Sequence, residues 1–137
     1  MIYPMFAMVV LTAVVLVTLF RSRVAAVRQD LVPVSYFGIY QGAVEPAFTA
    51  KPARHFANLF ETPVLFYVAC LAAMITKNTG LVMQALAWTY VLARVAHAYV
   101  HLGSNRIRHR LRVYFFSCLV LLVMWIYVVG AVSLSHT

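Results

Sequence analysis

The chain has 137 residues, of which 64% are hydrophobic and 10% are charged, and its formal net charge is +8. This composition excludes an ordinary water-soluble domain and predicts a small integral membrane protein that forms one domain. A basic excess would suit nucleic acid in a soluble protein. Here the Lys and Arg residues flank apolar runs, so membrane orientation and lipid headgroups explain them, and no nucleic-acid partner is expected.

The first predicted transmembrane helix covers residues 2–20, which carry no charge. At about 1.5 Å per residue this run is long enough to cross a hydrocarbon core of about 30 Å. Arg21, Arg23 and Arg28 follow the run instead of preceding it, which favours an uncleaved helix over a secretory signal. The connector that follows, residues 21–53, is longer than most links between helices. Its length leaves two interpretations open, a functional loop or a segment packed at the membrane interface.

Three further transmembrane helices are predicted at about 54–75, 81–102 and 113–134. Most Lys and Arg residues lie in the first and third connections, and the second connection has Lys77 alone. The positive-inside rule therefore orients both basic connections toward the cytoplasm and both termini toward the other side. The sequence predicts an all-α, four-helix membrane bundle with a basic cytoplasmic mouth.

Polar residues mark one face of the second predicted helix. Arg54, Asn58 and Glu61 are spaced i, i+4 and i+7, so they lie on one side of a helix. A carboxylate near the bilayer centre costs roughly 2.5–3.5 kcal/mol, and such groups usually face protein or a water-filled site. Glu61 is therefore expected to have a partner within the bundle.

The third predicted helix carries a matching polar face. Tyr90, Arg94, His97 and His101 share one side of it, and Arg94 lies at a depth similar to that of Glu61, which predicts an ion pair. Two interpretations remain open. The pair could only join two helices, or it could belong to a cationic pocket for a small anionic ligand at the cytoplasmic mouth. A metal site is not predicted, because His97 and His101 have no obvious third ligand on their face except the distant His55 or His109.

The spacing Arg54-x3-Asn-x2-Glu-x-Pro63 resembles the second-helix signature of the MAPEG family, the membrane-associated proteins in eicosanoid and glutathione metabolism. The stretch 90–103 resembles the third-helix motif of the same family. Together the two motifs are fairly specific, and the resemblance covers roughly residues 50–134.

The resemblance implies a homotrimer of four-helix subunits with glutathione, used as co-substrate, in clefts between neighbouring subunits. It implies a transferase or peroxidase that acts on a small lipophilic electrophile or hydroperoxide, in a bacterial-type inner membrane and among membrane lipids. The alternative is a non-enzymatic membrane protein that binds a lipid or a small anion, or whose polar core is only structural.

The resemblance also implies roles for individual residues. Glu61 would bind the α-amino group of glutathione, Arg54 a carboxylate, and Arg94 would orient Glu61. The thiolate-stabilising role falls on Arg108 by one spacing and on Arg110 by another, and both remain open. The full set implied to hold glutathione is Arg54, Asn58, Glu61, Arg94, His97 and His101.

Overall fold

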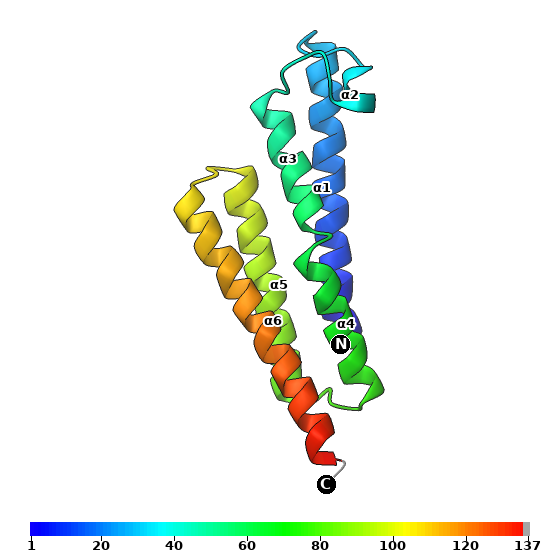
Figure 1. Ribbon diagram of the computed structural model, residues 1–137, viewed down its shortest axis with the longest axis vertical. Helices are drawn as coiled ribbons and strands as arrows, with labels where there is room; N and C mark the ends of the chain where they lie inside the picture. The colour runs from blue at the N-terminus through cyan, green and yellow to red at the C-terminus, as the bar shows by residue number, and fades with distance from the viewer. Residues whose placement is uncertain (136–137) are drawn as a thin grey trace.

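The protein is an all-helical bundle in the computed structural model, which describes residues 1–135 (Figure 1). No strand occurs within that range. The helices are α1 (Ile2–Arg28), α2 (Tyr36–Ile39), α3 (Ala47–Asn58), α4 (Thr62–Ile75), α5 (Leu81–Leu102) and α6 (Ile107–Ser135).

The long helices form two neighbouring pairs. α3 packs along α1, α5 packs along α6, and α4 joins the pairs through contacts with α6 and α1 (Figure 1). Three segments are long and apolar enough to cross a membrane, namely Ile2–Arg28, Ala47–Ile75 and Ile107–Leu134. α5 has 22 residues, enough for about 33 Å, but polar residues lower its hydropathy. These polar side chains face the interior, so α5 belongs to the same membrane bundle.

The helix limits differ from the expected ones in several places. The expected connector 21–53 contains α2, and α3 begins within it at Ala47. α1 continues beyond residue 20 to Arg28, and α6 begins at Ile107, several residues before the expected start. The second crossing is not continuous, because Leu59–Glu61 separate α3 from α4. Pro63 lies in the first turn of α4. Proline has no N–H group and its ring clashes with the carbonyl four residues earlier, so it begins a helix more readily than it continues one.

The first connection folds back onto the end of α1. Val32 and Tyr36 pack against Ala26 in a small apolar cluster separate from the main core. Arg23 Nη2 donates a hydrogen bond of 2.6 Å to the hydroxyl of Tyr40. Of the two interpretations of the connector, these contacts favour a packed segment.

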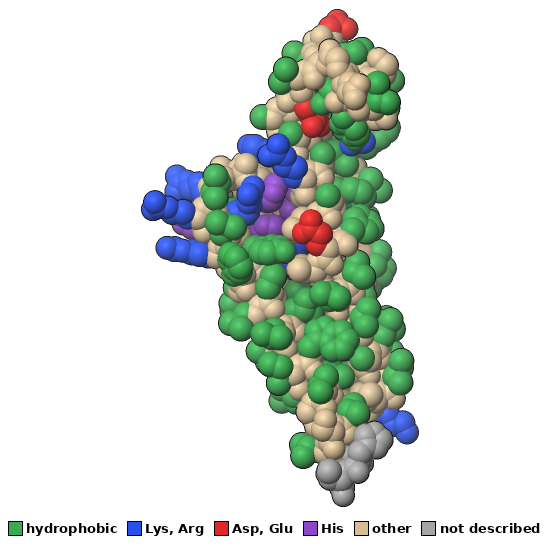
Figure 2. All heavy atoms as spheres, viewed as in Figure 1, with side chains coloured by type: hydrophobic (Ala, Val, Ile, Leu, Met, Phe, Trp, Pro, Cys, Tyr) green, Lys and Arg blue, Asp and Glu red, His purple; other side chains and the backbone are tan. Residues whose placement is uncertain are grey.

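Apolar side chains cover the outside of the bundle as well as its interior (Figure 2). Within the core the rings of Phe66 and Tyr90 stack with centroids 4.5 Å apart. On the outside, Leu119 and Ile126 are 58% and 62% exposed. An outer surface of this kind suits contact with acyl chains, whereas the polar groups of α5 lie inside.

Candidate functional site

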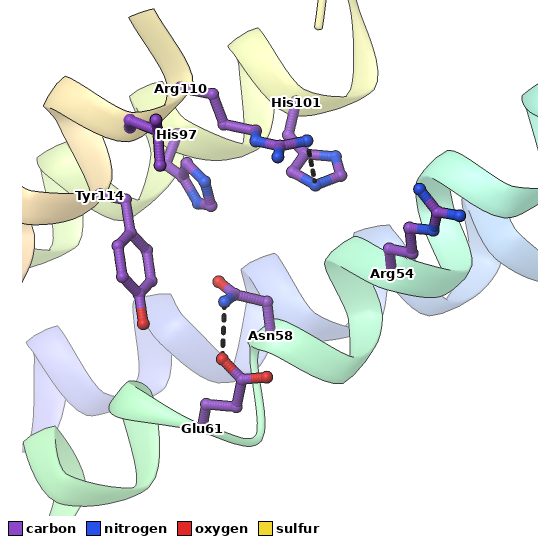
Figure 3. A pocket seen from close by; sticks show the side chains of 8 residues that line it. Arg54, Asn58, Glu61, His97, His101, Arg110 and Tyr114 are labelled. Atoms are coloured by element: carbon purple, nitrogen blue, oxygen red, sulfur yellow. Dashed lines mark hydrogen bonds between the residues drawn. The ribbon is translucent and has the colours of Figure 1, made fainter. Parts of the chain in front are cut away.

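A cavity of about 210 Å³ lies near the α5–α6 loop, between α3, α5 and α6 (Figure 3). Basic and histidine side chains gather on this part of the surface, as Figure 2 shows. Most of the residues that the sequence singled out meet here. The cavity is lined by Arg54, Asn58, Glu61, His97, His101, Arg110, Leu111 and Tyr114.

Arg94 and Glu61 are joined through Asn58. Arg94 is fully buried, and its Nη2 donates to Asn58 Oδ1 at 2.5 Å and to the Asn58 carbonyl oxygen at 3.4 Å. Asn58 Nδ2 in turn donates to Glu61 Oε2 at 2.8 Å (Figure 3). The structure thus replaces the expected direct ion pair with a bridged one. The physical reason is the break between α3 and α4, which turns Glu61 outward, so that its side chain is exposed in the single chain.

The charge of Arg94 is only partly compensated. Its Nε and Nη1 atoms have no hydrogen-bond partner among residues 1–135. Its Cζ atom lies 5.7 Å from the ring centroid of Tyr114, a distance at which a cation is attracted to the ring face. A buried guanidinium that lacks a full set of acceptors maintains a positive potential at the inner wall of the cavity.

Three histidine rings form another part of this wall. His97 and His101 of α5 line the cavity, and His55 of α3 lies behind them, fully buried. The ring centroid of His55 is 5.2 Å from that of His97 and 5.0 Å from that of His101. No group of three or more His, Cys, Asp or Glu suited to a metal ion occurs in the described part of the chain. The three rings pack against one another beside the cavity.

Arg110 and Arg108 lie on different sides of α6. Arg110 lines the cavity, and its Nη1 donates to Asn105 Oδ1 at 2.9 Å and lies 3.4 Å from His101 Nε2 (Figure 3). Arg108 is exposed and does not line the cavity. Side chains two residues apart on a helix point in directions about 200° apart around its axis. Only one of the two arginines can therefore face α5 and α3.

A model of the MAPEG family matches residues 1–130. The chain belongs to the MAPEG family. No curated protein and no solved structure gave a match. The match to the family model confirms the resemblance seen in the second and third helices. It also extends that resemblance over α1 and the connector, which carry no recognisable motif of their own.

Two residues that line the cavity of this MAPEG protein, Leu111 and Tyr114, were not singled out from the sequence, and His55 was considered only as a distant third metal ligand. Tyr114 lines the cavity with its ring centroid 5.6 Å from that of His97. Its position four residues after Arg110 was the available signal, because side chains at i and i+4 share a helix face. His55 gave no such signal, since its contacts with α5 depend on the rotation of α3 about its own axis.

A second cavity of about 290 Å³ adjoins the first in this MAPEG chain. The two share Arg54, His101 and Arg110, and the second is also lined by Glu45 and Lys51 from the end of the connector and the start of α3. The polar, mostly basic lining of the site therefore extends toward the connector.

Proposed function

We propose that this MAPEG protein binds glutathione and uses it to modify a lipophilic electrophile or hydroperoxide, as a membrane transferase or peroxidase. The observation that carries the proposal is a cationic cavity containing one carboxylate, located in an otherwise apolar bundle. Glutathione has two carboxylates, one α-ammonium group and a thiol, which matches this distribution of charge. Its lipophilic reaction partner would arrive from the bilayer.

The residues that hold glutathione in this proposal are those that the family resemblance implies, and the charges along the cavity agree with them. Arg54 binds a carboxylate, and Glu61 binds the α-ammonium group. Arg94 does not touch the ligand. It acts through Asn58, whose amide fixes the Glu61 carboxylate while accepting from the guanidinium. His97 and His101 complete the wall.

Arg110 is the better candidate for stabilising the thiolate. A thiol with a pKa of about 8.5 is mostly protonated at neutral pH, and an adjacent guanidinium lowers that pKa and raises the thiolate concentration. Arg110 lines the cavity and Arg108 does not, which supports this choice. The hydrogen bond to Asn105 holds the guanidinium of Arg110 in one orientation.

The thiolate then has two possible partners. Attack on an electrophilic carbon forms a thioether and expels the leaving group with its electron pair. Attack on a hydroperoxide oxygen gives an alcohol and a glutathione sulfenic acid. A second glutathione converts that sulfenic acid to a disulfide and water, so the two thiols supply both electrons for the reduction.

We further propose a homotrimer in which a neighbouring subunit closes each site. The exposure of Arg54 and Glu61 in the single chain supports this, because charged ligand-binding side chains are more effective when water is excluded from them. In the proposed orientation the cavity opens toward the cytoplasm of a bacterial-type inner membrane, and both termini lie on the opposite side.

Glutathione should raise the melting temperature of the detergent-solubilised protein. Mass action adds about 2.7 kcal/mol of stability at a ligand concentration one hundred times Kd. S-methylglutathione, which lacks the ionisable thiol, should stabilise the protein as well, and Arg54→Gln should weaken both effects. A polar core that is only structural would give no shift with either ligand. A shift without turnover of a test electrophile would leave a binding protein and contradict the transferase.

A further inference from the structure

A second hollow, of about 440 Å³, lies on the outer face between α5 and α6, away from the cavity described above. We refer to it as the outer groove. It is mostly apolar, and one arginine stands among its lining residues. The outer groove is lined by Thr89, Leu92, Ala93, Ala96, Arg112, Val113 and Phe116.

The sequence of α5 explains why this face is hollow. Thr89, Leu92, Ala93 and Ala96 follow the spacing i, i+3, i+4 and i+7, so they form one stripe along the helix. Two of the four side chains are single methyl groups, which leaves space between the helix backbone and Phe116 of α6. The outer groove is therefore a property of the helix pair itself.

Two arginines stand at the loop end of the outer groove. Arg108 and Arg112 are one turn apart on α6, and Phe116 is one turn further along the same side. Both guanidinium groups are exposed. No hydrogen bond or ion pair engages either of them within residues 1–135, whereas Arg110 on the opposite side is held by Asn105.

The position of Arg112 along α6 corresponds to the edge of the hydrocarbon layer. Residues 113–134 of the helix carry no charge, which at about 1.5 Å per residue is enough to cross the membrane. Arg112 is thus the last charge before the apolar part of the helix. A groove that begins beside it has its charged end at the level of lipid headgroups and its apolar part among acyl chains.

We propose that the outer groove binds an acidic phospholipid, with one acyl chain along α5 and the headgroup phosphate at Arg112 and Arg108. Charge complementarity selects this occupant. Two unpaired guanidiniums attract a net negative headgroup, whereas the quaternary ammonium of a zwitterionic lipid is repelled by them. The small Ala93 and Ala96 side chains allow the chain to lie close to the helix.

The test measures lipid retention by native mass spectrometry, after the purified protein is mixed with phosphatidylglycerol or with phosphatidylcholine of the same acyl chains. We expect tighter binding of phosphatidylglycerol, with a loss of about fivefold in Arg112→Gln and roughly thirtyfold in Arg108→Gln/Arg112→Gln. Arg106→Gln removes the same charge from the same loop, outside the outer groove, and should leave the lipid preference intact.

The apolar part is tested by filling the outer groove. Ala96→Phe should weaken binding of both lipids, whereas Val95→Phe, on the neighbouring outward face, should not. A photocrosslinking residue at Leu92, which is already large and 66% exposed, should label lipid. Equal affinity for the two headgroups, a preference that survives in the double arginine variant, or crosslinking of Leu92 to a second copy of the chain would each overturn the proposal.

Discussion

Replacing Arg110 by Gln should lower kcat for glutathione conjugation by about 10²-fold, the size of effect seen when one preorganised donor to a developing or fixed anion is removed. The variant should bind glutathione nearly as tightly as the wild type does, because in the proposed binding mode other residues of the cavity hold the carboxylates and the amino group. The ultraviolet absorbance of the bound thiolate, measured at neutral pH, should fall with kcat.

The pH profile separates this role from a structural one. With Arg110 present, we expect the bound thiol to be ionised at neutral pH. In Arg110→Gln its pKa returns toward about 8.5, so activity should recover as the pH rises through that value. A misfolded variant would not recover. Arg106→Gln is the matched control for loss of one charge, and a larger loss of kcat in Arg108→Gln than in Arg110→Gln would contradict the assignment.

Asn58→Ala should destabilise the protein by about 2–3 kcal/mol. The change removes the side-chain acceptor of the buried Arg94 guanidinium and leaves a charged donor unsatisfied, which costs more than the loss of a neutral hydrogen bond. The same change frees Glu61, so glutathione affinity should fall as well. Chemical denaturation in mild detergent and ligand titration measure the two effects separately.

A double-mutant cycle tests whether the loss arises from this contact. In an Arg94→Met background, where there is no buried charge to satisfy, Asn58→Ala should cost less than about 0.5 kcal/mol. Asn78→Ala is a matched control. Within residues 1–135 the side-chain amide of Asn78 donates only to Thr76 Oγ1, in the turn after α4, so its loss should have a small effect. Equal costs for Asn58→Ala in the two backgrounds would show that the amide does not couple to Arg94.

The sequence was sufficient to predict the membrane bundle and the inward polar face of α5. The apolar runs predict the bundle, and the i, i+4, i+7, i+11 spacing of Tyr90, Arg94, His97 and His101 predicts the polar face. The bridged link between Arg94 and Glu61 could not be predicted the same way. The apolar run through residues 54–75 predicts one continuous helix. Pro63, which favours the start of a helix, is the sign in the sequence that the run is divided.

Rotation of the helices about their axes was the other missing quantity. Periodicity shows which residues share a face, but not which neighbour that face meets. The choice between Arg108 and Arg110 needed the orientation of α6, and the burial of His55 needed that of α3. Tyr114 was partly predictable. The sequence shows that it shares a helix face with Arg110, but it does not show the contact with His97.

The break at residues 59–61 divides the second crossing into two helices whose main contacts differ. α3 packs mainly on α1 and also contacts α5, whereas α4 packs mainly on α6 and makes fewer contacts with α1 and α5. A tilt of α3 alone would therefore change the cavity beside Arg54 more than the apolar contacts between α4 and α6. A small polar ligand admitted by such a tilt would not require any helix to slide through the bilayer.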